Sequence, residues 1–479
     1  MQFNVGISIK EDVFSAIFSP RSIAVIGASA NGENIGANYF RALVRAGFTG
    51  KLYPVSQGGG HLLGYQVYRD LRALPEGPDY CIVAVPASSV PDVIDSCVER
   101  KVKVVQIYTA GFAEMGTDGA HLQSEVVRRA REGDVRIIGP NCMGICSPGA
   151  RIPFGTMDKI AETGPVAFLS QSGGLTGDMI LLGLERGIRF SKVVSFGNGC
   201  DLDIHQFLDF LSGDNETGII GAYVEDVRDG RRLMQQLRDL RGKKPVVLCK
   251  GGMTEPGTRA TMSHTGSLTL SPQRWSGALA QAGAISVDSL EALADMVLIF
   301  QQLPYHFGRR VALVSGLSGG GGGIGVIASD TCSRAGLVVP QFSLETQDKL
   351  QRLLPQVGVI VQNPLDLGGK SSNAELLESC LHICAGEPQV DILMVDLHVG
   401  KLADVAGEQQ VRNISLLLTK VAQSLSKPMI VVAKPGLAPH LCLEIQQYLA
   451  QNGLAVFPSI GQAARALALL NVWKELSLP

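Results

Sequence analysis

A chain of 479 residues with 46% hydrophobic residues, 18% charged residues and a net charge of −2 has the composition of a well-packed globular protein. The length predicts about three domains of roughly 150 residues each. This composition excludes a disordered chain, and the lack of a basic stripe interleaved with aromatic residues argues against nucleic acid as a partner.

The sequence carries no sign of export or of membrane insertion. Residues 1–11 lack the basic segment and apolar core of a secretory signal, and no apolar run reaches the roughly 18 residues that span a bilayer. The ten cysteines are scattered, and none has the C-x-x-C spacing of a zinc site. We therefore expect a cytoplasmic protein with no metal site and no membrane partner.

The first predicted elements form a βαβ unit. The apolar run Ser22–Ile26 predicts a strand, Gly27-Ala28-Ser29 a turn, and residues 36–46 a helix that Gly47 ends. Further strands are expected at 51–55, 80–85, 104–109 and 136–139. Strands that alternate with helices predict a parallel sheet, here a Rossmann-like domain over residues 10–148.

Two more α/β sets follow along the chain. Strands expected at 164–169, 192–196, 219–225, 245–250 and 284–287, closed by a helix at 290–301, predict a domain over residues 149–303. A polar, proline-containing linker precedes a third set, which starts with a strand at 310–314 and occupies residues 309–479. The predicted fold class is α/β, with an N-terminal Rossmann-like domain and two flavodoxin-like parallel-sheet domains.

The first glycine turn follows the first strand. A strand, a glycine turn and a helix start together present backbone N–H groups and the positive end of a helix dipole to an anion. Gly27-Ala28-Ser29 is not a full dinucleotide fingerprint, and Val55-Ser56-Gln57-Gly58 offers no carboxylate for a ribose. A nucleotide-like ligand other than NAD therefore fits better, and an NAD-dependent oxidoreductase is disfavoured.

The second glycine turn is Ser170-Gln171-Ser172-Gly173-Gly174, ahead of a helix expected at 175–184. Two hydroxyl groups and two glycines at a helix start suit a phosphoryl group. An ordinary tight turn with a serine cap is the alternative interpretation.

The third glycine turn runs from Ser315 to Gly323 and contains G-x-S-x-G, the nucleophile elbow of α/β-hydrolases. So long a glycine run is too slack to hold a strained nucleophile, and no oxyanion-type His-Gly-Gly segment precedes it. An anion-binding helix start is preferred over a hydrolase.

Two titratable residues are candidates for catalysis. His264 lies in Met262–Leu268, a stretch of small residues expected to be a loop, where an imidazole is available for chemistry. Most lone histidines are surface or structural residues, so His264 alone is weak evidence. Glu225 ends the strand at 219–225, where it could orient an imidazole or simply support the following turn.

Several segments together resemble the NDP-forming acyl-CoA synthetase family, which is related to succinyl-CoA synthetase and ATP-citrate lyase. The resemblance extends over nearly the whole chain and is looser in the last third. Its most specific stretches are Ser22–Ser29, Gly139–Gly144, Ser170–Gly174 and Lys250–Leu268.

The resemblance implies that the first domain binds CoA. Two departures concern this binding and the third turn: Ser56-Gln57-Gly58 replaces the family's Asn-Pro-Lys, and the third glycine turn lacks its Asn-Ala-Gly-Gly form. The implied CoA contacts, the last two of them near the thiol end, are Gly27, Ala28, Ser29, Val85, Pro86, Ala110, Gly111, Asn141 and Cys142.

The resemblance also implies a phosphoryl relay in the second and third domains. His264 matches the histidine that is transiently phosphorylated, and Glu225 matches the carboxylate that positions it. Two helix starts would hold the phosphoryl group, with Ser172, Gly173, Gly174, Gly319 and Gly320 as the expected residues.

The reaction implied is acid + CoA + ATP ⇌ acyl-CoA + ADP + phosphate, through an acyl phosphate and a phosphohistidine. No ATP-grasp region is recognisable in the sequence, so ATP or ADP with Mg is expected on a separate ATP-grasp β-type subunit. The chain itself would then be an α-type subunit that takes a small carboxylic acid or acyl-CoA and phosphate. The alternative is a CoA- or acyl-CoA-binding protein without a complete reaction, which would not need both His264 and Glu225.

Overall fold

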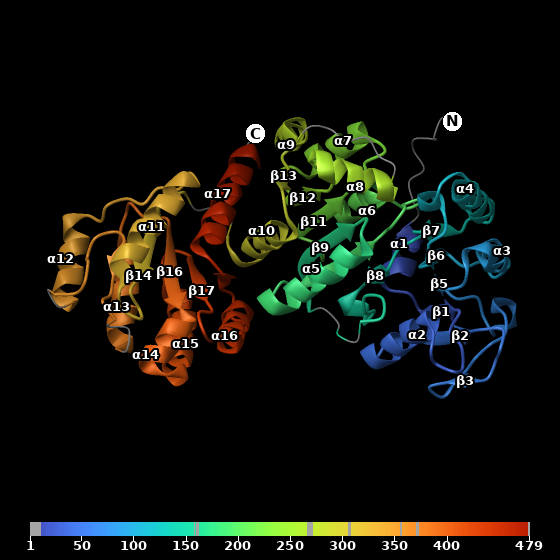
Figure 1. Ribbon diagram of the computed structural model, residues 1–479, viewed down its shortest axis with the longest axis horizontal. Coiled ribbons are helices and arrows are strands. Elements are labelled where there is room, and N and C mark those ends of the chain that lie inside the picture. Colours follow the sequence, from blue (N-terminus) through green and yellow to red (C-terminus); the bar gives the residue numbers. More distant parts are fainter. Residues whose placement is uncertain are drawn as a thin grey trace. The chain divides into compact units, whose positions relative to one another are not determined.

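The computed structural model describes residues 11–157, 159, 162–265, 272–304, 308–354, 357–369 and 373–477 (Figure 1). Contacts divide the chain into two compact units. The first comprises Met1–Leu181 with Arg189–Leu290, and the second comprises Leu182–Ile188 with Glu291–Pro479.

The first sheet of unit one is parallel, in the order β2-β1-β5-β6-β7. Successive residues of a strand point to opposite faces. Ile23 and Val25 of β1 therefore pack with α1 and α2, whereas Ala24 and Ile26 pack with α3 and α4. The elements are α1 (Glu11–Phe18), β1 (Ser22–Ile26), α2 (Ile35–Ala46), β2 (Lys51–Val55), β3 (His61–Leu62), β4 (Tyr65–Gln66), β5 (Tyr80–Val83), α3 (Val90–Glu99), β6 (Val104–Ile107), α4 (Thr117–Glu132) and β7 (Arg136–Ile138).

The second sheet of unit one has the order β13-β12-β11-β9-β10-β8. All its pairings are parallel except that of β8 with β10. Strand β8 lies within the range predicted for the first domain but belongs to this second sheet. The elements are β8 (Gly144–Cys146), β9 (Thr163–Ser170), α5 (Gly173–Arg186), β10 (Phe190–Ser195), α6 (Ile204–Gly213), β11 (Ile219–Val224), α7 (Gly230–Leu240), β12 (Val246–Lys250), α8 (Glu255–Thr265), α9 (Pro272–Gln281), β13 (Ile285–Val287) and α10 (Leu290–Gln302).

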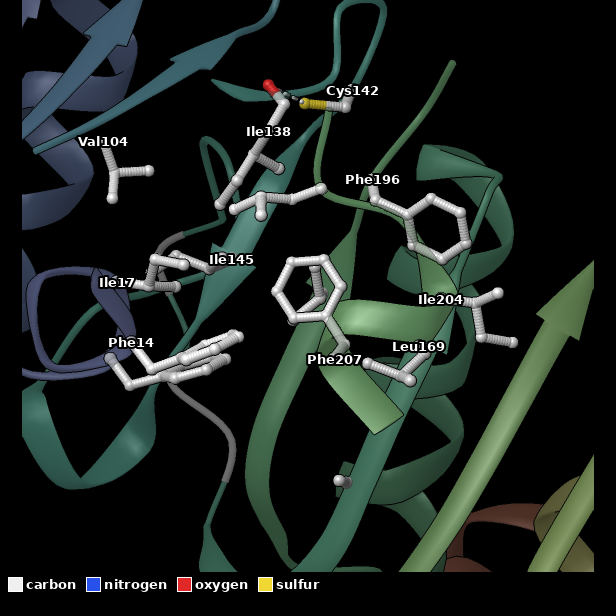
Figure 2. Packing of buried hydrophobic residues seen from close by; sticks show 14 of the residues in the cluster. Phe14, Ile17, Val104, Ile138, Cys142, Ile145, Leu169, Phe196, Ile204 and Phe207 are labelled. Atoms are coloured by element: carbon white, nitrogen blue, oxygen red, sulfur yellow. Dashed lines mark hydrogen bonds between the residues drawn. The ribbon is translucent and has the colours of Figure 1, made fainter. Parts of the chain in front are cut away.

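The two sheets of unit one share a core. Phe14 of α1 stacks on Phe210 of α6 with ring centroids 4.4 Å apart. Phe14 also meets Phe207 edge-on, with ring centroids 6.2 Å apart, and Figure 2 shows these two side chains in the core. A buried ion pair adds to this junction, because Asp201 accepts from Arg136 Nε at 2.7 Å and from the backbone N–H of Ile137 at 3.0 Å. The first sheet is thus fixed against the second.

The third sheet, in unit two, is parallel in the order β15-β14-β16-β17-β18. The end of α5 and most of α10 belong to this unit, where Arg186 and Asp295 form a buried ion pair at 2.6 Å. The remaining elements are β14 (Val311–Ser315), α11 (Gly321–Arg334), α12 (Leu344–Leu353), β15 (Leu365–Asp366), α13 (Ala374–Gly386), β16 (Ile392–His398), α14 (Val399–Ala406), α15 (Glu408–Ser424), β17 (Met429–Lys434), α16 (Pro439–Gln451), β18 (Ala455–Phe457) and α17 (Ile460–Ser477).

The three sheets repeat one winding order. Counting parallel strands by their position along the chain, each sheet reads 2-1-3-4-5. The strand order reverses between strands 1 and 3, and ligands of such sheets bind at that point, beyond the carboxyl ends of the strands. The predicted α/β class with parallel sheets is therefore confirmed, and each sheet has one defined place for a ligand.

The expected loop around His264 is wrong in part. Residues 262–265 are the last turn of α8, which begins at Glu255. The threonine hydroxyls bond to local backbone carbonyls: Thr261 Oγ1 donates to the Gly257 carbonyl within the helix at 2.9 Å, and Thr258 Oγ1 donates to the Gly252 carbonyl in the preceding turn at 3.1 Å. An ion pair between Arg259 and Glu255 spans one turn.

Among the helices of the described ranges, none is long and apolar enough to cross a membrane. The same ranges contain no group of three or more His, Cys, Asp or Glu side chains that could hold a metal ion.

Candidate functional site

Four loops meet at the carboxyl edge of the first sheet. The Ala84 N–H donates to the Ile26 carbonyl at 2.9 Å, and Thr109 Oγ1 donates to the Val85 carbonyl at 2.6 Å. The Asn141 N–H donates to the Thr109 carbonyl at 3.0 Å, which brings in the loop after β7. The structure therefore gathers the residues expected to contact CoA around the switch point between β1 and β5.

Gly27 is required by the close approach of these loops. Its φ is +100°, and a Cβ there would lie 2.4 Å from the Ala84 carbonyl oxygen. The N–H groups of Gly27 and Ala28 both donate to the Val55 carbonyl, at 2.8 and 3.2 Å. These two N–H groups are already used within the fold, which leaves Ser29 and the start of α2 to face a ligand.

Asn34 caps α2 directly behind this turn. Its Oδ1 accepts from the Ala37 N–H at 2.9 Å, and its Nδ2 donates to the Gly27 carbonyl at 2.7 Å. One side chain thus satisfies an orphan helix donor and fixes the glycine turn to the helix that follows it.

The turn at Ala110-Gly111 is shaped by Glu114. Its Oε1 accepts from the N–H groups of Gly111 and Phe112, at 2.6 and 3.0 Å, and its Oε2 accepts from Asn198 Nδ2 at 2.5 Å. Burial opposes ionisation of this carboxyl, but the hydrogen bonds from Asn198 and the backbone outweigh it and lower the pKa of Glu114 below its ordinary value. A carboxylate therefore ties the turn after β6 to the loop after β10.

Cys142 lies in the core rather than on an open surface. Figure 2 shows its sulfur directed at the Ile138 carbonyl, at 3.6 Å, and the Ile107 carbonyl lies at 3.5 Å. Burial raises the pKa of the Cys142 thiol to about 12. A thiol in this state is not a nucleophile, so the role that the position can have is to shape the loop.

The start of α5 lies at the switch point of the second sheet. Ser172 Oγ accepts from the Leu175 N–H at 3.3 Å, and Ser170 Oγ accepts from the Ser172 N–H at 3.0 Å. The helix begins at Gly173, two residues earlier than predicted, so Gly173 and Gly174 form its first turn. The first N–H groups of a helix have no partner within it, and a dipole of positive sign lies there.

Glu225 lies beside this helix start, at the end of β11. Its backbone N–H and that of Asp226 both donate to Gln171 Oε1, the latter at 2.9 Å. Tyr223 donates its hydroxyl to Glu225 Oε1 at 3.2 Å, and Lys250 Nζ donates to the Glu225 carbonyl at 2.8 Å. The structure thus joins Glu225 to the Ser170–Gly174 segment through Gln171.

Burial tunes the groups around Glu225. It lowers the pKa of the Lys250 ammonium, which lies 5.8 Å from the Trp275 ring centroid. Burial, together with the carboxylate of Glu225, raises the pKa of Tyr223 above its ordinary value, so this phenol stays a hydrogen-bond donor. These groups hold the Glu225 carboxylate in a fixed environment.

His264 belongs to α8, and its side chain lies outside the described residues. The helix follows β12 by a short turn in which the Gly251 N–H donates to the Val224 carbonyl at 2.9 Å. The turn that leads to the histidine helix therefore starts next to Glu225, while the expected contact between the two side chains stays a prediction.

The third glycine turn, in unit two, carries charges of both signs. Lys401 Nζ donates to the Gly319 carbonyl at 2.7 Å, and Gly320 caps α11 with φ +67°. A Cβ on Gly321 would lie 2.5 Å from the Asp366 carboxylate. This helix start therefore has a lysine and a buried carboxylate as close neighbours.

Sequence reasoning missed the side chains that hold these turns in place. Gln171 lies inside a segment already singled out for its glycines, and Lys250 ends a predicted strand at the ligand edge. The bonds from Asn198 to Glu114 and from Lys401 to Gly319 had no local signal, because the partners are 84 and 82 residues apart in the sequence.

Comparisons with known proteins agree with this geometry. Residues 21–148 match the family model described as a CoA binding domain, and residues 163–300 match the model described as a succinyl-CoA ligase like flavodoxin domain. The first range contains the first sheet and strand β8, and the second range contains the other strands of the second sheet.

Relatives of known function resemble nearly the whole chain. The α subunit of acetate–CoA ligase [ADP-forming] I from Pyrococcus furiosus is 32% identical over 472 residues, covering 96% of this chain and 97% of the relative. Acetate–CoA ligase [ADP-forming] I from Archaeoglobus fulgidus is 35% identical, and this chain spans 64% of its length.

A solved structure has the same fold. It is the dinucleotide forming acetyl-coenzyme A synthetase 1 of Candidatus Korarchaeum cryptofilum in complex with phosphate and ADP. The TM-score is 0.83 at 28% sequence identity, covering 97% of this chain and 98% of that one.

Proposed function

We propose, from the premise that this chain belongs to the family of ADP-forming acetate–CoA ligase α subunits, that it carries the CoA site and the phosphohistidine of such a ligase. It is an enzyme of the acid–thiol ligase class. The reaction is acid + CoA + ATP ⇌ acyl-CoA + ADP + phosphate, with a small monocarboxylic acid as the substrate.

The first step joins phosphate to the acyl group. A phosphate oxygen attacks the thioester carbonyl, the C–S bond breaks, and CoA leaves as the thiol after taking a proton. The CoA thiol end lies near Asn141 and the phosphate lies at the start of α5. The N–H groups of Gly173 and Gly174 stabilise the charge on the phosphate oxygens, because they are preorganised donors at a positive helix end.

The second step moves the phosphoryl group to His264. The imidazole nitrogen attacks phosphorus, the bond between phosphorus and the acyl-group oxygen breaks, and the carboxylate leaves with the electron pair of that bond. Glu225 orients the imidazole and balances its charge. The main support for this proposal is that the backbone N–H groups of Glu225 and Asp226 donate to Gln171, within the Ser170–Gly174 turn. These bonds support one shared site for the phosphate and the Glu225 carboxylate.

The phosphoryl group then passes from His264 to ADP. We assign ADP and its Mg to an ATP-grasp β-type partner subunit, because relatives of this chain are named as α subunits of ADP-forming ligases. The helix start at Gly319-Gly320 in unit two is the proposed second holder of the phosphoryl group. Lys401 supports that role through its charge.

The alternative is a CoA-binding protein that completes no reaction. The test is to incubate the chain with its ATP-grasp partner, acetyl-CoA and labelled phosphate, and then to measure acid-labile phosphate on the chain. We expect acid-labile, base-stable label in the wild type and none in His264→Ala, because the P–N bond of a phosphohistidine hydrolyses in acid and survives base, whereas an acyl phosphate is labile in both. His121→Ala, which changes an exposed histidine of α4, is the matched control and keeps the label.

Absence of label with every acyl-CoA, with CoA still bound, leaves the binding protein as the function. Label that persists in His264→Ala places the phosphoryl group on another residue and refutes the assignment.

A further inference from the structure

Met143 follows the Asn141-Cys142 pair, and its backbone is fixed from three sides. Its carbonyl accepts from Tyr39 Oη and from Gln106 Nε2, both at 3.0 Å. Its N–H donates to Ser195 Oγ at 3.4 Å. These partners come from α2, β6 and β10, so both sheets of unit one determine where this residue lies.

The side chain of Met143 occupies the space that two glycines leave. A Cβ on Gly155 would lie 2.5 Å from the Met143 Cε, and a Cβ on Gly173 would lie 2.5 Å from its Cγ. The thioether therefore runs between these glycines, and the side chain is half-buried. Methionine is unbranched and adapts its shape to a neighbour more readily than other apolar residues.

The chemistry of the proposed reaction puts the acyl group at the same place. A phosphate at the start of α5 has to approach the thioester carbonyl to about 3–3.5 Å before it can attack. The carbonyl therefore lies between the CoA thiol end near Asn141 and the helix start at Gly173. Met143 lies next to both places, because it follows Cys142 in the loop at the CoA thiol end and its side chain contacts Gly173 at the helix start.

We propose that Met143 forms the wall of the acyl pocket and sets the length of the acyl chain that the enzyme accepts. The wall selects short, uncharged acyl groups. None of the neighbours of Met143 named above has a formal charge that could pair with the second carboxylate of a dicarboxylic acid. These neighbours are Tyr39, Gln106, Gly155, Gly173 and Ser195. This inference rests on the proposed function, because it needs the thioester and the phosphate to meet at Gly173.

The experiment compares acyl-CoAs of increasing length. The complex of the chain with its ATP-grasp partner is given phosphate, ADP and acetyl-, butyryl-, hexanoyl- or succinyl-CoA, and thiol release is measured as kcat/KM. We expect Met143→Ala to raise the ratio of hexanoyl-CoA to acetyl-CoA by at least about tenfold, because a methylene in an apolar pocket changes discrimination by roughly 10- to 200-fold. Met143→Leu keeps a similar volume and keeps the ratio within about threefold.

Met115→Ala is the matched control, since Met115 is 74% exposed on the surface of unit one, and it leaves the ratio unchanged. We expect succinyl-CoA to have a lower kcat/KM than acetyl-CoA with the wild type. A CoA dissociation constant measured for each variant checks that the site is folded, and Met143→Val replaces the alanine variant if that one does not fold.

Two failures are distinguishable. A wild type that releases no thiol from any acyl-CoA and forms no phosphoprotein refutes the proposed function, and this inference with it. Two results would refute the role of Met143 while leaving the proposed function intact. One is an active enzyme in which Met143→Ala or Met143→Val has the same hexanoyl-to-acetyl ratio of kcat/KM as the wild type. The other is a wild type that prefers succinyl-CoA.

Discussion

The turn at Ala110-Gly111 depends on the Glu114 carboxylate, and Glu114→Gln measures that dependence. The substitution keeps the size of the side chain and removes its charge. Two backbone hydrogen bonds, at 2.6 and 3.0 Å, change from charge-assisted to neutral, and the new amide N–H₂ group faces the Asn198 donor at the Oε2 position.

Charge-assisted hydrogen bonds contribute about 1.5–3 kcal/mol and neutral ones about 0.5–1.5 kcal/mol, so the two changes, about 1–1.5 kcal/mol each, and one lost bond sum to about 3.5–6 kcal/mol. Glu114 is partly exposed, and solvent screening reduces this by about half. The remaining ~2–3 kcal/mol corresponds to a rise of about 30- to 150-fold in the KM for CoA.

The assay is steady-state kinetics with CoA varied at saturating acid and ATP. We expect kcat to change less than KM, because in the proposed function the turn contacts CoA away from the reacting atoms. Glu132→Gln, which removes an exposed partner of Arg128 on α4, is the control and leaves both constants unchanged. An unchanged KM for CoA in a folded Glu114→Gln variant would refute the positioning role.

The same carboxyl gives a dependence on pH. Its pKa is lowered in the folded chain, so its contribution is present above the ordinary value of 4.5 and is lost as the pH falls through the lowered value. CoA binding to the wild type should therefore weaken in this acidic range, and the Glu114→Gln variant should lack that part of the pH dependence.

Two further predictions concern the junction of the sheets and the cysteine beside the reaction. Asp201→Asn removes the carboxylate that pairs with Arg136, and the Asp201 side chain is 3% exposed. The substitution should lower the free energy of unfolding of unit one by about 3–5 kcal/mol in urea. A loss under about 1 kcal/mol would contradict a buried ion pair. Cys142→Ser should keep kcat within about threefold in the ligase assay, because a hydroxyl can donate to the same carbonyls at Ile107 and Ile138; loss of the phosphohistidine in this variant would instead indicate that the thiol takes part in chemistry.

Strands and their turns follow from the sequence because their signals are local. A short apolar run before a glycine turn, such as Ser22–Ile26 or residues 164–169, is buried on both faces of a parallel sheet and reads as a strand without knowledge of its neighbours. The strand order of each sheet was not predicted and comes from the structure.

Elements that the local sequence does not indicate could not be predicted. Helix α8 has a proline, a glycine and several threonines, so its composition resembles a loop, and the hydroxyl of Thr261 bonds to a carbonyl of the helix. Strand β8 has three residues and forms because β10 is available to pair with it.

The candidate site was predicted more fully in position than in detail. Glycine turns mark the ligand edge of each sheet, since only glycine allows the approach seen between Gly27 and Ala84. Whether a turn's N–H groups are available is a different question, and those of Gly27 and Ala28 donate to Val55 from the neighbouring strand. Whether these N–H groups are free for a ligand depends on Val55, which lies outside the glycine motif.

The crossing of β8 into the second sheet has a consequence for how such chains can be cut and recombined. A polypeptide that stops after residue 148 keeps β8 but loses β10, the strand to which β8 is bonded, and loses the carboxylate of Asp201 that holds Ile137. It also exposes Phe14, whose ring stacks on Phe210. We therefore expect the first two sheets to fold together, and a breakpoint between them to disrupt both.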